Sequence, residues 1–416
     1  GGLGRARAGA MSVVAVVGGG TAGLHAVATL ALERSRTVLW CDAAGFQRGL
    51  MAGYRRVPAN TKLEKLLKIF ARPELEPWRR LHPPLAAAVE RLAATSVPLP
   101  ALAERDPAMG WTSLGAVDEV FGELQAAVEA HGANVRRVPA RVEGLALGAA
   151  DAGGRARWRL ELGPEGEDLE ADAVMLATGG DPRVLQLPPH RAEPIPLLTA
   201  LEPEKLAEAL DPARRGAPVR AAAVLGNSHS AVIVLDHLLR AGVPRVVCAA
   251  RRPARHAEWV PEADDYRYTM SGLKGYGSAF AREHGLDGEP AAPAAAEGTP
   301  RVEPRPWSAL EEGLLDECDV VVQALGFEGS PLPRLSAAGA RVPWSVPELQ
   351  REPETSQLWL PQGACPVELS HLYGAGIAFP EDPGSCATSP GEPPVGFAFA
   401  ASAAARCDAH LRSCGL

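Results

Sequence analysis

The sequence predicts an α/β fold that contains two units of strand, glycine turn, helix and strand. Three observations support this prediction. Short apolar runs, the first of them mostly β-branched, lead into glycine turns at Gly18 and Gly226. Each turn is followed by an apolar helix pattern and then by a second strand pattern. The length of 416 residues allows two or three domains, each with a buried core.

The first unit begins with a strand pattern at 12–17 and a turn that fits G-x-G-x-x-G. A helix pattern covers 24–32, a second strand covers 37–40, and an acid follows. In a Rossmann-type unit, the glycines make the tight turn, admit a pyrophosphate to the backbone and let helix and strand touch, while the acid accepts ribose hydroxyls. An ordinary glycine turn is the alternative. The predicted dinucleotide contacts are Gly18, Gly20, Thr21, Ala22, Gly23 and Asp42.

The second unit repeats this order with a weaker fingerprint, because a serine replaces the middle glycine and an alanine the last. Its strand, turn, helix and strand are expected at 219–225, 226–231, 232–239 and 245–250. Two arginines follow the second strand instead of an acid, and arginines favour the 2′-phosphate of NADPH. A solvated basic turn is the alternative. The predicted contacts are Gly226, Asn227, Ser228, His229 (its imidazole on a phosphate), Ser230, Arg251 and Arg252.

Composition argues against several other classes of protein. The net charge of −8 disfavours non-specific nucleic-acid binding. No apolar run is long enough for a transmembrane helix, so we expect no membrane span and a cytoplasmic location. The seven cysteines show neither C-x-x-C nor C-x-x-x-x-C spacing, so we expect free thiols, no closely spaced redox dithiol and no metal site. Residues 1–11 are expected to be a disordered leader.

Four further segments carry a family resemblance. Residues 171–180 and 318–327 look like the A-T-G turns at which two-dinucleotide flavoproteins pass between domains. Residues 371–380 look like the last strand returning to a flavin, and residues 57–62, Val-Pro-Ala-Asn-Thr-Lys, resemble an asparagine-containing segment that lies over it. With both glycine turns, the chain resembles the pyridine nucleotide-disulphide oxidoreductase-like superfamily, nearest its flavin-containing monooxygenase branch.

The resemblance implies two Rossmann-like dinucleotide-binding domains, with the NADPH domain inserted in the FAD domain. The predicted bounds are 12–182 for the first part of the FAD domain, 183–325 for the NADPH domain and 326–416 for the second part of the FAD domain. The resemblance also implies that FAD is contacted by Val142 (beside the adenine), Gly179 and Gly376, with Asn60 and Lys62 as catalytic candidates.

The implied activity is that of an FAD-dependent, NADPH-using oxidoreductase, and a monooxygenase of small molecules is favoured. The monooxygenase fingerprint F-x-G-x-x-x-H-x-x-x-[WP] is absent, so two alternatives stay open. One is a reductase that passes electrons to a quinone or a protein. The other is a non-catalytic sensor of nicotinamide redox state. A homodimer is compatible with the sequence.

Finer expectations concern individual segments. Residues 287–305 are rich in Pro, Ala, Glu and Gly and should form a surface loop. His25 should pack in the core. Tyr266, Tyr268, Lys274 and Tyr276 form a cluster that shields the flavin, lines a substrate pocket or lies in a surface turn. We also expect a helical excursion at 62–104, a helix at 123–131 and strands at 134–140, 155–162 and 169–177.

Overall fold

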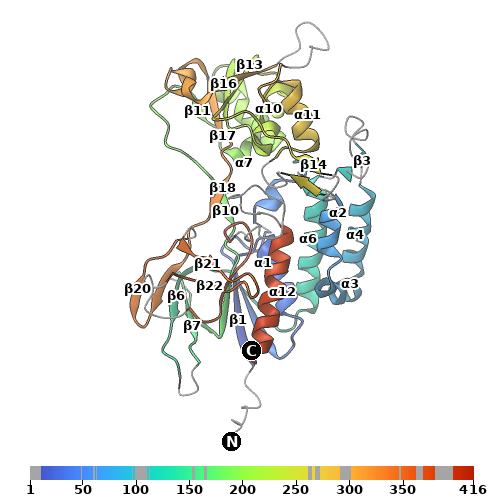
Figure 1. Cartoon of the computed structure of the whole chain (residues 1–416), viewed down its shortest axis with the longest axis vertical. Helices are drawn as coiled ribbons and strands as arrows, with labels where there is room; N and C mark the ends of the chain where they lie inside the picture. The colour runs from blue at the N-terminus through green and yellow to red at the C-terminus, as the bar shows by residue number, and fades with distance from the viewer. Residues whose placement is uncertain are drawn as a thin grey trace, which may run out of the picture.

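The computed structural model has two lobes joined by a narrow two-stranded connection (Figure 1). The structure describes residues 11–47, 49–59, 61, 63–95, 97–98, 110–111, 113–151, 155–163, 166–260, 265–267, 272–290, 301–345, 348–361, 369–379 and 397–416.

The first lobe is organised by a parallel sheet of five strands in the order β23-β9-β1-β2-β5. All strand pairs are parallel, so the carboxyl ends of β1, β2 and β9 meet at one edge, where Val17 is paired with Cys41 and with Leu176. The strands are β1 Ser12–Val17, β2 Arg36–Cys41, β5 Val135–Val138, β9 Ala173–Leu176 and β23 Leu372–Gly374.

The second lobe is organised by another parallel five-stranded sheet, in the order β11-β17-β12-β13-β16. Its strands are β11 Glu193–Pro194, β12 Ala221–Leu225, β13 Arg245–Ala250, β16 Val302–Pro306 and β17 Val320–Gln323. All of them fall between β9 and β23 in the sequence, so the second sheet interrupts the chain of the first. The α/β fold class is therefore confirmed, while the residue bounds of the domains stay a prediction.

A third sheet, of order β20-β19-β6-β7-β8, covers one face of the first. Its strands are β6 Val142–Leu147, β7 Trp158–Leu162, β8 Leu169–Ala171, β19 Arg334–Ala337 and β20 Ala340–Val342. The two-stranded pairs are β3 Val97–Pro98 with β4 Gly110–Trp111, β10 Gly180–Pro182 with β18 Phe327–Gly329, β14 Glu258–Val260 with β15 Asp265–Arg267, and β21 Gln350–Arg351 with β22 Leu358–Trp359. The β10–β18 pair connects the lobes (Figure 1).

Helices cover the other face of the first sheet and pack on the second. In the first lobe they are α1 Thr21–Leu30, η1 Gly49–Gly53, α2 Leu63–Phe70, η2 Pro73–Leu75, α3 Glu76–Leu81, α4 Pro83–Ala94, α6 Leu114–His131 and α12 Phe397–Ser413. In the second lobe they are α7 Leu197–Ala200, α8 Pro203–Leu210, α9 Pro212–Arg215, α10 His229–Arg240, α11 Gly275–Glu283, η4 Trp307–Leu310 and η5 Leu314–Glu317.

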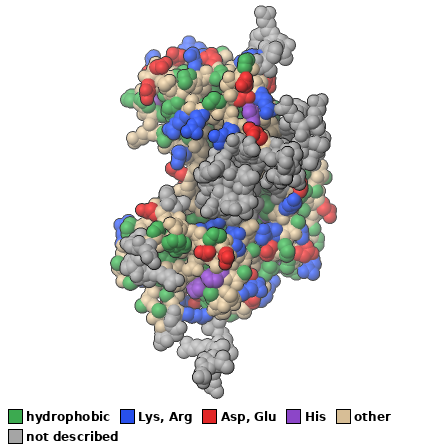
Figure 2. Space-filling view, viewed as in Figure 1, with side chains coloured by type: hydrophobic (Ala, Val, Ile, Leu, Met, Phe, Trp, Pro, Cys, Tyr) green, Lys and Arg blue, Asp and Glu red, His purple; other side chains and the backbone are tan. Residues whose placement is uncertain are grey.

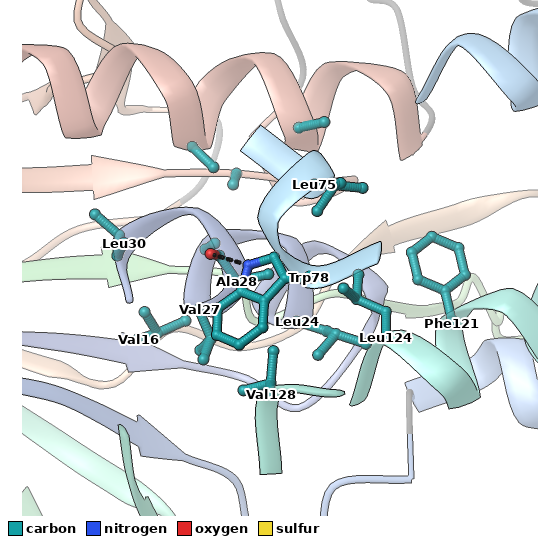
Figure 3. Close-up of a cluster of buried hydrophobic side chains, with 14 of the residues drawn as sticks. Val16, Leu24, Val27, Ala28, Leu30, Leu75, Trp78, Phe121, Leu124 and Val128 are labelled. Carbon is teal, nitrogen blue, oxygen red and sulfur yellow. Dashed lines mark hydrogen bonds between the residues drawn. The ribbon is translucent and has the colours of Figure 1, made fainter. Parts of the chain in front are cut away.

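The first lobe's helical core is centred on Trp78, which is completely buried (Figure 3). Its ring lies among Leu24, Val27 and other apolar side chains, and its indole N–H donates to the Ala28 carbonyl at 2.8 Å. This bond satisfies the polar end of a buried tryptophan. It also fixes α3 to α1, the helix that follows the first glycine turn.

Two expectations about segments were wrong, and a third, the helix at 123–131, is confirmed but was too short. The strand expected at 169–177 is split at Asp172, because its carboxylate accepts from the Val13 N–H at 2.8 Å at the corner where the chain leaves the third sheet for the first. The helix expected at 123–131 begins at Leu114, capped by the Ser113 hydroxyl. The loop expected at 287–305 ends in strand β16, whose prolines are tolerated because the strand is at a sheet edge.

Candidate functional site

The first glycine turn lies at the carboxyl end of β1 and is closed tightly at Gly18. Its φ of +126° is in the region that favours glycine, and a Cβ there would lie 2.1 Å from the Ala177 carbonyl oxygen. The Gly18 N–H donates to the Cys41 carbonyl at 2.8 Å. Gly18 therefore holds together the ends of β1, β2 and β9.

The remaining glycines of the turn play different steric roles. A Cβ on Gly23 would lie 1.9 Å from the Gly18 carbonyl oxygen, so α1 begins in direct contact with the turn. A Cβ on Gly20 would meet nothing within 4 Å, so the backbone is open there. Thr21 and Ala22 open α1, where N–H groups have no helical partner and favour an anion. The turn thus has a closed side and an open side.

Asp42 stands where the sequence predicts, directly after β2. One carboxylate oxygen accepts from the Gly19 N–H at 3.0 Å and the other from the Phe46 N–H at 2.8 Å. An ionised carboxylate has about four acceptor positions, so two are left for further donors. The acid therefore both fixes the turn and keeps capacity for hydroxyl groups.

Residues distant in sequence join this turn. Gly376, at a φ of +86°, is placed so that a Cβ would come within 2.8 Å of the Ala22 side chain. Gly179 has a φ of +76° and open space where a Cβ would be. Sequence patterns missed two neighbours: the Thr178 hydroxyl is buried without a hydrogen-bond partner, and Gly49 lies against Gly20, with 3.2 Å between a built Cβ and the Gly20 Cα.

The other predicted residues of the first site are placed less directly. Val142 begins β6, and its side chain is buried in the core shared by the first and third sheets. Its contact with an adenine stays a prediction. Asn60 and Lys62 lie outside the described residues, between the buried Ala59 and the buried Leu63.

The second glycine turn lies at the carboxyl end of β12 and is closed in the same way as the first. Gly226 has a φ of +109°, and a Cβ there would lie 2.4 Å from the Ala324 carbonyl oxygen. Ser228 precedes α10 in an extended conformation, its side chain makes no capping bond, and Ser230 follows in the first turn of the helix. The Asn227 amide donates to the Arg252 carbonyl at 2.6 Å.

Arg251 and Arg252 follow β13, as predicted, and both are exposed. The Arg251 guanidinium lies 4.8 Å from the centre of the Trp307 ring, which orients it by a cation–π contact. Figure 2 shows a hollow between the two lobes, with Lys and Arg side chains gathered on its second-lobe side. Because both arginines are exposed, their guanidinium groups can meet an anion from solvent.

The turn that carries these arginines is held by a small polar cluster. His256 lies 2.9 Å from the Ser278 hydroxyl through Nδ1 and 3.0 Å from an Asp287 carboxylate oxygen through Nε2. The Ala254 N–H donates to the Leu286 carbonyl at 2.7 Å. These bonds connect the arginine turn to both ends of α11.

His229 is placed differently from our expectation that its imidazole touches a phosphate. Nε2 lies 2.8 Å from the Pro58 carbonyl oxygen in the first lobe, and Nδ1 is buried without a partner. Burial lowers the pKa of this imidazole. The backbone at the start of α10, rather than the ring, is therefore left to face an anion.

The remaining candidates are His25 and the cluster of Tyr266, Tyr268, Lys274 and Tyr276. His25 packs against Phe70 and Phe121 and is buried, as expected. Lys274 is buried, and Tyr276 lies within 3.5 Å of Arg240. Tyr268 lies outside the described residues, and nothing is described of the Tyr266 side chain.

The described cysteines are all free: Cys41, Cys248, Cys318, Cys407 and Cys414. Burial raises the pKa of Cys41 and of Cys248 to about 12, which keeps both thiols protonated and unreactive. Over the parts of the chain that are described, no group of three or more His, Cys, Asp or Glu could hold a metal ion. No helix in those same parts is long and apolar enough to cross a membrane.

Comparisons with known proteins agree with this geometry. The monooxygenase AgnR1 of Paecilomyces divaricatus is 27% identical over 387 residues, which cover 88% of this chain and 89% of that protein. The structure of L-lysine 6-monooxygenase from Pseudomonas syringae aligns with a TM-score of 0.57 at 15% identity, covering 97% of this chain and 99% of that one. Ornithine N-hydroxylase KtzI of Kutzneria sp. 744, solved with reduced FAD, NADP+ and L-ornithine, aligns with a TM-score of 0.55 at 16% identity, covering 98% and 100%.

A family model described as pyridine nucleotide-disulphide oxidoreductase matches residues 12–344. The match includes both glycine turns and every strand of the two parallel sheets except β23, and it confirms the resemblance seen in the sequence. The chain belongs to the pyridine nucleotide-disulphide oxidoreductase family.

Proposed function

We propose that this chain is an FAD-dependent, NADPH-using monooxygenase of small molecules. The observation that carries the proposal is the pair of glycine turns, which are built alike but end in opposite charge. A carboxylate beside the first suits ribose hydroxyls, and two arginines beside the second suit a 2′-phosphate. Two different dinucleotides in one chain follow from this difference.

The first turn fits FAD on three counts. The backbone is open at Gly20 and Gly179, where a side chain would obstruct a close pyrophosphate. The buried Thr178 hydroxyl lacks a protein partner, and such a group is costly unless a ligand satisfies it. The residues that would hold FAD are Gly18, Gly20, Thr21, Ala22, Gly23, Asp42, Val142, Gly179 and Gly376.

The second turn fits NADPH. The N-terminus of α10 offers unpaired N–H groups, and the exposed arginines supply positive charge one strand away. The residues that would hold NADPH are Gly226, Asn227, Ser228, Ser230, Arg251 and Arg252, with His229 contributing its backbone.

The chemistry belongs largely to the cofactors. Bound FAD would accept a hydride from NADPH and react with dioxygen, which is the chemistry a monooxygenase requires. The protein would hold both dinucleotides at facing strand ends, and the segment at 57–62 would lie over the flavin, as the resemblance implies. Asn60 and Lys62 in that segment stay proposals as the residues nearest the reaction.

The monooxygenase assignment is supported by the similarity to AgnR1 across most of both chains and by the fold shared with an L-lysine 6-monooxygenase and an ornithine N-hydroxylase. A small-molecule substrate fits these relatives. A homodimer, a cytoplasmic location and the domain bounds 12–182, 183–325 and 326–416 stay proposals of the same kind.

The experiment begins by identifying the flavin released from the purified protein. The flavin is then reduced anaerobically with NADPH and with NADH, and oxygen labelled with ¹⁸O is added together with amine, sulfide or ketone substrates. We expect FAD, faster reduction by NADPH and one labelled oxygen atom in a product. Protein that cannot bind FAD would refute the whole proposal. Unlabelled products with stoichiometric peroxide, together with rapid reduction of a quinone, would establish the reductase.

A further inference from the structure

Residues Tyr54–Ala59, here called the bridging segment, belong to the first lobe's chain but contact both lobes. On the first-lobe side, the segment is fixed to the start of α6. The Leu114 N–H donates to the Val57 carbonyl at 2.8 Å, and the Gly115 N–H donates to the Arg55 carbonyl at 3.0 Å. A Cβ on Gly115 would lie 2.4 Å from that Arg55 oxygen, so the approach needs glycine.

On its other side, the bridging segment enters the core of the second lobe. Val57 is 5% exposed and belongs to the same buried cluster as the side chains of β12 and α10. The Tyr54 ring packs edge-on against Phe327 in the connection between the lobes. At the surface, Arg56 pairs with Glu204 of α8 at 2.5 Å. The segment is thus sandwiched between α6 and the second lobe.

The polar link across this contact is made by His229. A carbonyl oxygen can only accept, so Nε2 must carry the proton in its 2.8 Å bond to Pro58. Nδ1 is then a buried acceptor without a partner, and α11 closes over it, because a Cβ on Gly277 would lie 3.3 Å away. The geometry fixes both the tautomer and the plane of the ring.

We infer that His229 is a positioning residue that holds the bridging segment, through the Pro58 carbonyl, at a fixed place relative to the N-terminus of α10. His229 is the first residue of α10, directly after the second glycine turn, and Pro58 stands two residues before Asn60. One hydrogen bond therefore connects the turn proposed for NADPH to the segment proposed to face FAD. The kinetic part of this inference rests on the proposed function.

The consequence concerns hydride transfer rather than binding. Neither nucleotide needs to touch the imidazole, so its loss should leave both affinities nearly unchanged. The two dinucleotides would instead be held less accurately against each other, and misplacement of about 1 Å can lower a rate on the order of hundredfold.

The test compares His229→Ala, His229→Gln and a matched control, His237→Ala. His237 also lies on α10 and contacts a carbonyl, that of Ala200 at 3.1 Å, but this bond stays within the second lobe. Amide hydrogen exchange is measured on the FAD-bound proteins for peptides that cover 54–59 and 113–115. The limiting rate of flavin reduction and the Kd for NADPH are measured by anaerobic stopped flow.

We expect His229→Ala to speed exchange in both peptides and to lower the limiting rate by about tenfold to hundredfold at an unchanged Kd. The amide of His229→Gln can donate to the Pro58 carbonyl, so this variant should restore most of the exchange protection and most of the limiting rate. His237→Ala should change neither the exchange nor the rate. Unchanged exchange in His229→Ala, no rescue by glutamine, or an equal effect of His237→Ala would overturn the inference. A protein that binds no FAD would refute the proposed function instead, and exchange on that protein would still decide whether His229 holds the segment.

Discussion

The two glycine turns share a backbone but differ in every side chain that a nucleotide would meet. Gly18 and Gly226 each have a positive φ, and each donates its N–H at 2.8 Å to the strand that follows the helix. A Cβ on either glycine would clash with the carbonyl of the residue that follows β9 or β17. Even the residues before the helices agree, since Gly20 and Ser228 have nearly the same extended conformation. The backbone conformation of the turn therefore belongs to the fold, and the side chains around it determine which dinucleotide fits.

The agreement extends to the start of each unit. Asp172 and Asp319 both accept from the backbone at the beginning of the central strand, at 2.8 Å from the Val13 N–H and 3.0 Å from the Ala221 N–H. Both aspartates precede the strand that returns beside the central one. An identical solution at both places indicates that it serves the βαβ unit itself, not a cofactor.

The turns differ in how they are tied to the end of the second strand. In the first, the Asp42 side chain accepts from the turn's backbone, so its negative charge is drawn over the turn. In the second, the Asn227 side chain donates to the Arg252 carbonyl just after the strand, and the arginine side chains stay exposed. The reversed direction of one hydrogen bond thus accompanies the reversed charge of the site.

The largest expected effect comes from exchanging the third position of the turns. Gly23→Ala would place a methyl group 1.9 Å from the Gly18 carbonyl oxygen, and backbone cannot give way cheaply. We expect a loss of about 3–5 kcal/mol in stability. The reverse exchange, Ala231→Gly, should cost only about 0.5–1 kcal/mol. The thermal unfolding midpoint should therefore fall much further for Gly23→Ala than for Ala231→Gly. Equal midpoints would mean that α1 and α10 lie at the same distance from their glycine turns.

The next effect concerns pH. Burial, aided by the nearby Arg72, lowers the pKa of His25 from 6.5 to about 4, whereas the corresponding position of α10 is Ile233. The unfolded chain binds a proton at this histidine below pH 6.5, whereas the folded protein does so only near pH 4. The free energy of unfolding is therefore unaffected by His25 above pH 6.5 and falls by about 3 kcal/mol as the pH drops to 4. His25→Ile should flatten that dependence in unfolding midpoints measured from pH 7 to pH 4. An unchanged pH profile would show that another group governs acid unfolding.

The sequence was sufficient for features that are local in the chain. The strand, turn and helix order, the glycines with positive φ and the charges after β2 and β13 all stand within short windows. It could not reveal contacts made by distant segments. The His229 bond to Pro58 joins residues 171 positions apart, and Gly49 reaches Gly20 only through the fold of η1. The full length of α6 was missed because Gly115 and Gly122 weaken its local helix pattern, which packing overrides.

A smaller effect is expected from the arginines that distinguish the second turn. Replacing Arg251 and Arg252 together by alanine removes at least one charged hydrogen bond to a 2′-phosphate, which is worth about 1.5–3 kcal/mol. The preference for NADPH over NADH should fall by about tenfold or more, with the NADH affinity unchanged. Arg305→Ala, on the exposed edge strand β16, is the control and should leave the preference intact. Titrations of both nucleotides would measure it, and a preference that survives the double change would assign those arginines to solvent.

The smallest effects come from exchanging the middle position, where the two backbones nearly coincide. Gly20→Ala adds a methyl group in open space, so the fold should be retained while FAD binding weakens by about 1–3 kcal/mol, because the methyl occupies the path of the pyrophosphate. Ser228→Gly removes one hydroxyl donor, and NADPH binding should weaken by about 0.5–1.5 kcal/mol. Flavin fluorescence titration of the apoprotein and NADPH titration of the holoprotein measure the two affinities. If Ser228→Gly tightened NADPH binding, the serine side chain would hinder the pyrophosphate instead of donating a hydrogen bond to it. The serine would then not be an adaptation of the second turn to NADPH.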